Sequence, residues 1–437
     1  MIKLYFFMFG TFLLLPAVVT FLYYEDYTSL LMMTLIILSF VFFYIGAGLF
    51  YKVSSVRELK YTVGNRRFVW FLLYMFVLTY LLMFIDFGGI PLLQYSNVEN
   101  TSILRAEFTK ADGGLLSVLT YFKSIFSKGM LPILVCWFYF KESRKAFICM
   151  VVVLTFLMLS AFEKAGLLWI FLPLFFIQFH EKKYKEFFQS ILFVLICTSF
   201  VSVVSLSHLA SATNDKSNND ITNDITIKYA NIKTYRNPDD FLDDAYIITK
   251  DNHLQSSVSS GFSLASVYEE DDYQFLLTFG MKTDPLLFML NRLFWIPFIT
   301  AYDTLLFWQQ NYNEHLYFGV NRYLAAMTGY PFADLERRVF RFQFGSGIGS
   351  TGNSNASYIS EAYIGFGYIG VAVFSFLLGG MTGVFSKSDI TVFRVVLPLV
   401  YFSVLSASFI SSLFSGGLLL MFVIFFILTR SVNERSS

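Results

Sequence analysis

The hydrophobic segments of this chain stop in its second half and then resume. Apolar runs fill most of residues 4–206 and return at Tyr358, while residues 207–357 are largely polar. The 437 residues are 56% hydrophobic and only 14% charged, and a soluble domain of this length has too small an interior to bury so much apolar surface. The pattern therefore predicts an integral membrane protein with one large insert outside the bilayer.

The lengths of the apolar runs predict the number of membrane spans. A helix needs about 20 residues to cross the hydrocarbon core, so we expect an all-α polytopic membrane protein with about 10 transmembrane helices and at most about 12. Segment 285–308 is apolar too, but because it carries Arg292 and Asp303 we interpret it as a helix at the outer membrane interface. The predicted spans are 4–24, 29–51, 68–85, 115–140, 146–162, 165–179, 187–206, 358–385, 394–410 and 413–429.

The basic residues predict the orientation of these spans. Every second loop is rich in lysine and arginine, and the loops between are nearly free of them. Because cytoplasmic loops carry the excess of basic residues, we expect both termini in the cytoplasm and residues 207–357 on the outer face. The residues that set this pattern are Lys52, Arg57, Lys60, Arg66, Arg67, Lys141, Arg144, Lys145, Lys182, Lys183 and Lys185.

The expected organisation has three parts. Residues 1–206 hold the N-terminal spans with an outer loop at 87–114, residues 207–357 form the insert, and residues 358–437 hold the C-terminal spans. Within the insert, an acidic lobe (207–284) precedes a helical part rich in arginine and aromatic residues (285–357). The formal net charge is only +1, which argues against nucleic acid as a partner.

Arginines on the outer face are candidate anion ligands. Arginine binds phosphate oxygens through two parallel hydrogen bonds, which lysine cannot do. The alternative is that these arginines pair with Glu314, Asp334 or Glu336, or touch lipid headgroups. Residues 285–357 contain no lysine, one histidine (His315), and the arginines Arg292, Arg322, Arg337, Arg338 and Arg341.

Several charged residues lie close to predicted outer membrane boundaries. Lys123 and Lys128 fall in the outer half of a span, where we expect their side chains to reach toward headgroups. The adjacent residues Glu163 and Lys164 occupy a very short hairpin and indicate either a site or a local salt bridge. Glu361 opens the first span after the insert, and a carboxylate there is costly unless it is paired or in a wet cavity. Glu361 is therefore a candidate base or the partner of an arginine.

Three short motifs together resemble a known family. They are a Gly-Ile-Pro-Leu loop at 89–92 followed by Arg105, a Glu-Lys-Ala-Gly-Leu-Leu hairpin at 163–168, and Glu-Ala-Tyr-Ile-Gly-Phe-Gly at 361–367, which opens a late helix. With the large outer insert, these motifs resemble the Wzy-type O-antigen and capsular polysaccharide polymerases of bacteria. In this resemblance Lys164 takes the basic place of the hairpin motif.

The resemblance implies an inverting glycosyltransferase with a GT-C-like fold at the outer face of the bacterial inner membrane. Its substrates would be undecaprenyl-pyrophosphate-linked oligosaccharides, and its partners the chain-length regulator and flippase of the same pathway. No paired histidines or Asp-x-Asp spacing suggests a metal outside the membrane, so we expect metal-independent chemistry and no cofactor. The candidate pyrophosphate ligands are Arg105, Lys164, Arg292, Arg322, Arg338 and Arg341.

Two residues are candidates for the base that deprotonates the acceptor hydroxyl, namely His315 and Glu361. An unperturbed histidine titrates near neutral pH, and we favour His315 because the resembling O-antigen ligases also rely on a histidine in this loop. The alternatives for the whole chain are an O-antigen ligase, with the same chemistry on a lipid A acceptor, and a polysaccharide flippase or other transporter. A structural membrane component is the third, since the acidic lobe would suit recruitment of other proteins.

Overall fold

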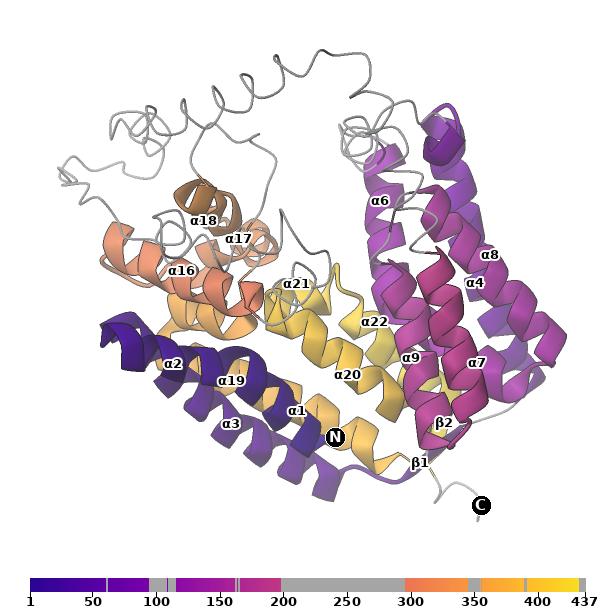
Figure 1. Cartoon of the computed structure of the whole chain (residues 1–437), viewed down its shortest axis with the longest axis horizontal. Coiled ribbons are helices and arrows are strands. Elements are labelled where there is room, and N and C mark those ends of the chain that lie inside the picture. Colours follow the sequence, from indigo (N-terminus) through magenta and orange to yellow (C-terminus); the bar gives the residue numbers. More distant parts are fainter. Residues whose placement is uncertain are drawn as a thin grey trace. The chain divides into compact units, whose positions relative to one another are not determined.

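The computed structural model describes residues 1–59, 62–93, 108, 115–161, 163, 166–197, 295–344, 354, 356–388 and 391–431. Nearly all of these residues are helical (Figure 1). The predicted acidic lobe 207–284 lies outside the described residues. The chain divides into two compact units, of which unit 1 comprises Met1–Val53, Thr222–Val384 and Tyr401–Ser411, and unit 2 comprises Ser54–Ile221, Phe385–Val400 and Ser412–Ser437.

Five helices are long and apolar enough to cross a membrane, which supports the predicted class of helical membrane protein. They cover Ile2–Tyr24, Tyr27–Val53, Val63–Asp86, Val118–Lys141 and Tyr358–Lys387. The full set of ten spans remains a prediction. The segment interpreted as interfacial contains α16 (Ile296–Asn311), whose 16 residues are fewer than the about 20 that a span requires.

Unit 1 is built on two long helices, α3 (Tyr27–Val53) and most of α19 (Tyr358–Lys387). Shorter elements surround them. These are α1 (Ile2–Phe9), the π-helix η1 (Gly10–Leu14), α2 (Leu15–Tyr24), α16, the 3-10 helix η5 (Tyr317–Val320), α17 (Arg322–Thr328) and α18 (Leu335–Phe344), with the last residues of α20 (Thr391–Leu405) and the first of α21 (Phe409–Leu413).

Small residues let α3 and α19 approach closely. A Cβ atom on Gly379 would overlap the backbone carbonyl of Phe43, and one on Gly383 would overlap that of Ala47. Phe43 and Ala47 are four residues apart, as are the two glycines, so each pair faces the other helix across one turn. Close packing over small residues is a common means of helix association in membranes, and it explains why this part of α19 is rich in glycine.

Unit 2 is a second group of helices with one small sheet. The strands β1 (Arg57–Leu59) and β2 (Thr429–Ser431) pair antiparallel, with Arg57 opposite Ser431. Sequence patterning did not predict this ribbon. The helical elements are α4 (Val63–Asp86), the 3-10 helix η2 (Pro91–Leu93), α6 (Leu115–Ile125), the π-helix η3 (Phe126–Met130), α7 (Leu131–Lys141), α8 (Arg144–Ser160), α9 (Gly166–His180), residues 184–197, most of α20, and α22 (Leu418–Leu428).

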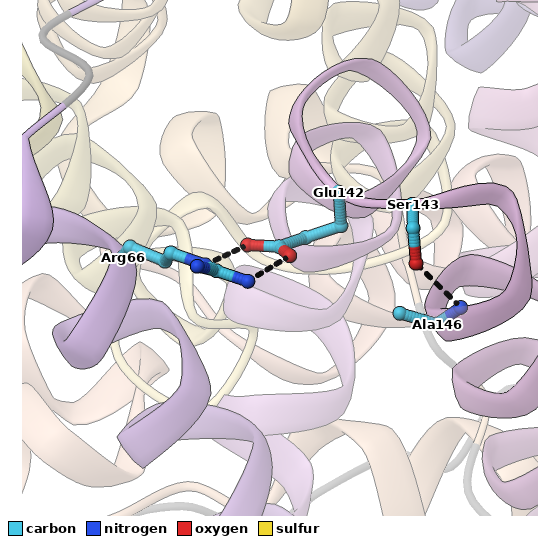
Figure 2. A network of polar contacts seen from close by, with 4 residues as sticks. All are labelled: Arg66, Glu142, Ser143 and Ala146. Atoms are coloured by element: carbon cyan, nitrogen blue, oxygen red, sulfur yellow. Dashed lines mark hydrogen bonds and ion pairs between the residues drawn. The ribbon is translucent and has the colours of Figure 1, made fainter.

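The predicted basic loops of unit 2 are fastened by polar contacts. Figure 2 shows that Arg66 makes a two-pronged ion pair with Glu142, from Nε to Oε1 at 2.9 Å and from Nη2 to Oε2 at 3.0 Å. The next residue, Ser143, caps α8 by accepting a hydrogen bond from the Ala146 backbone N–H. The hairpin between α7 and α8 is thus tied to the first turn of α4.

The C-terminal region differs from the two predicted spans 394–410 and 413–429. The structure places three shorter helices there, α20 with 15 residues, α21 with 5 and α22 with 11. Hydropathy identifies the apolar run but not the positions at which its helices end. Gly417 adopts a left-handed conformation with φ of 72° at the N-terminus of α22, and its backbone lies so close to Gly129 that a Cβ on either residue would overlap the other.

Candidate functional site

In unit 1, α16 is anchored to the ends of three helices. The Tyr302 hydroxyl donates to Asp26 Oδ2 (2.8 Å) in the turn between α2 and α3, and Thr28 donates to Gln309 Oε1 (2.7 Å). On another side of α16, Ser360 donates to the backbone carbonyl of Ala301. The turn after α2 and the start of α19 therefore lie on the same side of unit 1. The basic-loop pattern predicts that this side is the outer face.

Next to α16, the first turn of α19 holds a buried carboxylate. Glu361 is 9% exposed, and its Oε1 accepts a hydrogen bond of 2.9 Å from Asn321 Nδ2. The same amide nitrogen lies 2.9 Å from Ser408 Oγ and 3.1 Å from Ser411 Oγ. Oε2 of Glu361 has no hydrogen-bond partner among the described residues. One carboxylate oxygen is thus held in place by a hydrogen bond, while the other is buried without a hydrogen-bond partner among the described residues.

Local sequence explains why Asn321 occupies this position. Its Oδ1 accepts from the Tyr323 backbone N–H at 3.0 Å and caps α17, a role that asparagine fills well. The cap fixes the side chain, so its amide group points away from α17 toward Glu361. The short α17 then ends at Gly329, whose φ of 74° suits a residue without a Cβ.

His315, which lies between α16 and η5, is held in an aromatic box formed by Trp308 of α16 and Tyr363 of α19. Its ring stacks on Trp308 with a centroid distance of 5.3 Å and an interplanar angle of 11°. Tyr363 meets the His315 ring edge-on at 5.5 Å, and the backbone N–H of Leu316 donates to the carbonyl of Ile364. His315 Nδ1 is buried and has no hydrogen-bond partner among the described residues. The structure therefore brings both predicted base candidates, His315 and Glu361, to the same part of unit 1.

A break in α19 makes room for the histidine. Gly367 has φ of 63° and ψ of −153° within the helix, a conformation that is essentially restricted to glycine. A Cβ at this position would lie 3.1 Å from His315 Nε2. Gly367 is thus required both by its backbone conformation and by the imidazole beside it.

The arginines of α18 project from a helix packed on α16. Leu335, Val339 and Gln343 form its buried face at spacings of four residues. Gln343 Nε2 donates to the fully buried Asp303 Oδ2 at 2.8 Å, and Gln343 Oε1 accepts from Ser354. The remaining faces of α18 carry the basic residues.

The four described arginines predicted on the outer face have different surroundings. Arg322 is exposed and lies over the Phe332 ring at 5.9 Å. Arg338 donates to the Tyr312 hydroxyl at 2.9 Å, and Arg337 pairs with Asp334 at 3.6 Å. Arg341 lies partly buried in the last turn of α18. The predicted alternative of local acid pairing therefore applies to Arg337. Arg322 directly follows Asn321 and is the candidate closest in sequence to the Glu361 cluster.

Two acidic side chains of this region, Glu336 and Tyr312, have raised pKa values. Burial raises the pKa of Glu336, the negative charge of Asp334 raises it further, and Arg322 opposes the shift. Burial also raises the pKa of the Tyr312 phenol, against the opposing effect of the Arg338 guanidinium. Arg322 and Arg338 therefore each lie close enough to an acidic group to oppose the rise of its pKa.

Three predicted phosphate ligands, Arg105, Lys164 and Arg292, lie outside the described residues. The site contains residues that sequence analysis did not select, namely Asn321, Ser408 and Ser411 around the carboxylate, and Trp308 and Tyr363 around the imidazole. Asn321 carried one usable signal, since an asparagine directly before a short helical run is typical of an N-cap. Nothing in the sequence connected it with Glu361.

Unit 2 contains a separate cluster of charges. Lys123 Nζ lies 2.5 Å from Glu163 Oε1, and the Tyr80 hydroxyl donates to Glu163 Oε2 at 2.9 Å. The expectation that Lys123 reaches toward headgroups is wrong, because this residue is only 5% exposed and its ammonium group pairs inward. Glu163 makes its salt bridge with this distant lysine.

Comparison with known proteins finds no matching family model, no matching characterised protein and no matching solved structure.

Proposed function

We propose that this protein is a glycosyltransferase of the Wzy polymerase type. It would join undecaprenyl-pyrophosphate-linked oligosaccharide repeat units into O-antigen or capsular polysaccharide at the outer face of the bacterial inner membrane. The observation that carries the proposal is the Glu361 carboxylate, which is buried at the end of a span with one oxygen held by Asn321 and the other unpartnered. Such an arrangement is costly in a membrane protein unless it serves a function.

The proposed reaction is a single displacement. The acceptor hydroxyl gives its proton to a base, its oxygen attacks the anomeric carbon of the donor, and the bond from that carbon to the pyrophosphate oxygen breaks. The leaving pyrophosphate takes the electron pair, and the configuration at the anomeric carbon inverts. Cationic groups fixed at the outer boundary would stabilise the charge that develops on the leaving group. We give this role to Arg322, because it directly follows Asn321.

The geometry favours Glu361 over His315 as the base. A catalytic base is usually oriented by a further hydrogen bond, and Asn321 supplies this to Glu361. The His315 ring is instead oriented by stacking on Trp308, and its Nδ1 lacks a partner among the described residues. We assign His315 to shaping the site beside Tyr363, in a box whose aromatic rings suit the apolar face of a sugar.

Glycan banding in the bacterium from which the gene comes tests the proposal. Cells lacking the gene should carry a single repeat unit per lipid, because the other steps of the pathway are intact. Complementation with Glu361→Gln should leave that single-repeat product, since the amide cannot accept the proton. Glu314→Gln is the matched control, because Glu314 is an exposed carboxylate next to His315 in unit 1 and should restore full-length polymer at equal expression.

The other outcomes separate the alternatives. Complete absence of glycan on lipid A in the deletion strain would identify a ligase instead. Unaltered banding would refute both the polymerase and the ligase hypotheses and would favour a transporter. Restoration of polymer by Glu361→Gln together with single repeats from His315→Ala would move the role of base to His315.

A further inference from the structure

The charged cluster of unit 2 is the strongest feature that the proposed reaction does not use. Lys123 and Lys128 both lie in the candidate span Val118–Lys141, and Glu163 lies in the loop between α8 and α9. Both carboxylate oxygens of Glu163 are occupied, one by Lys123 and the other by the Tyr80 hydroxyl. Among the described residues the cluster therefore contains two ammonium groups and one carboxylate.

Lys128 is the residue whose charge is left without a direct partner. It is only partly exposed, and its Nζ has no hydrogen-bond acceptor or ion pair among the described residues, although it lies close enough to Glu163 for the two charges to interact. It belongs to η3, a π-helical turn within an otherwise α-helical span. Such turns are frequent at functional sites. An ammonium group inside a span is costly unless an anion compensates it.

Helix lengths place this cluster within reach of the outer leaflet. With the Lys141 end cytoplasmic, as the basic loops predict, Lys128 lies about 20 Å and Lys123 about 27 Å along the helix from that end. Helices α8 and α9 have 17 and 15 residues, or about 26 Å and 23 Å, which is less than the hydrocarbon thickness of about 30 Å. The loop that holds Glu163 therefore lies at or slightly below the outer boundary.

The direction of the lysine side chain completes the argument. Side chains on a helix lean toward its N-terminus, which for this span is the outer end. The Lys128 ammonium is thus directed from the middle of the span toward the level of Glu163 and the lipid headgroups. A lipid phosphate at that boundary supplies the missing negative charge and accepts the hydrogen bonds for which Lys128 has no acceptor among the described residues.

We propose that Lys128, next to the Lys123–Glu163 ion pair, forms a binding site for the phosphate group of a membrane lipid. The shared chemistry is a lipid-borne phosphate, whose source is either a polyprenyl phosphate carrier or an anionic phospholipid. The site requires only the charges of unit 2, so it does not depend on the proposed glycosyltransferase activity. Glu163 keeps Lys123 in place and limits the net charge of the cluster to one.

Native mass spectrometry of the full-length protein in neutral detergent tests this site. Undecaprenyl phosphate, phosphatidylglycerol and phosphatidylcholine would each be added, and the retained lipid counted. Lys128→Met should weaken retention of the anionic lipids by about tenfold or more, because a charge-assisted contact is lost. Lys145→Met is the matched control, since Lys145 is an exposed lysine at the start of α8 and should leave retention unchanged.

Further measurements distinguish binding from structural damage. Lys128→Met should not lower the Tm, because it removes an unpaired charge and nearly preserves side-chain volume, and Lys128→Arg should restore lipid retention. Loss of undecaprenyl phosphate alone would identify a carrier site, and equal loss of phosphatidylglycerol a general lipid-phosphate site. Equal retention by the Lys128→Met and Lys145→Met variants would overturn the proposal, as would full displacement of lipid by inorganic pyrophosphate from the aqueous phase.

Discussion

Replacement of Asn321 by aspartate tests the central contact of the candidate site. Asn321 has two separate roles, since its Oδ1 caps α17 and its Nδ2 donates to Glu361. Aspartate keeps an oxygen for the cap, and it caps helices about as well as asparagine. It replaces the donor to Glu361 by a second acceptor. Asn321→Asp therefore removes one role and preserves the other.

The size of the electrostatic repulsion follows from the distance between the side chains of residues 321 and 361. Two unit charges 2.9 Å apart repel by about 6 kcal/mol at an effective dielectric constant of 20. The folded protein relieves this repulsion by binding one proton between the two carboxylates, which then share it. The variant is therefore expected to lie within about 1 kcal/mol of the wild type at acidic pH, the size of one exchanged hydrogen bond. It should lose stability steadily as the pH rises.

The assay is the midpoint of thermal unfolding in detergent, measured at a series of pH values from acidic to neutral, because two adjacent carboxylates lose their shared proton as the pH rises. Asn313→Asp is the control, because Asn313 is an exposed asparagine of the same segment and its substitution should give no comparable pH slope. Identical slopes for the two variants would refute the contact between Asn321 and Glu361. Full-length polymer from the Asn321→Asp variant at neutral pH would refute the need for an ionised, oriented Glu361.

Two further predictions concern packing and protonation elsewhere in unit 1. Gly379→Ala should destabilise the protein by about 1–3 kcal/mol, because its Cβ overlaps the Phe43 carbonyl and overpacking costs this much. Gly48→Ala is the control. No atom lies near a Cβ at Gly48, so this substitution should be neutral or stabilising in the same unfolding assay. Glu336 has a raised pKa in the folded state, so its contribution to stability is complete below the ordinary value near 4.5 and is lost as the pH rises through the raised pKa. Glu336→Gln should remove that pH dependence from the Tm.

The sequence predicted the parts of the fold that depend on hydropathy and length. The run expected at 358–385 is observed at Tyr358–Lys387, and the run at 68–85 at Val63–Asp86. The prediction was wrong where packing between residues far apart in the sequence ends a helix. The C-terminal run breaks at Gly417, because its backbone packs against Gly129, and no local pattern of apolar residues encodes a contact between positions so far apart.

In the candidate site, too, the sequence identified residues by their own chemistry but not the partners that the fold brings to them. Glu361 was selected because a carboxylate beside a span is costly, a cost that depends on the residue alone. Its partners Asn321 and Ser408 come from other segments, and only the fold brings them together. The prediction for Lys123 was wrong for the corresponding reason, since its ammonium group pairs with Glu163, a residue of another segment that only the fold brings close.

The kink at Gly367 allows a test of the histidine that is independent of the reaction. Gly367→Ala carries two costs. The backbone conformation with φ of 63° and ψ of −153° costs a non-glycine residue about 1–3 kcal/mol, and the added Cβ, 3.1 Å from His315 Nε2, pushes the imidazole against Trp308.

Only the second cost depends on His315, so a double-mutant cycle separates the two. The Tm and the free energy of unfolding would be measured for Gly367→Ala, His315→Ala and the pair. We expect the pair to be more stable than the sum of the single effects by about 0.5 kcal/mol or more, the range of coupling between residues in contact. The part of the Gly367→Ala destabilisation that remains when His315 is absent is the cost of the backbone conformation. Strict additivity would mean that the helix break and the histidine are independent, and the aromatic box around His315 would then have no part in shaping α19.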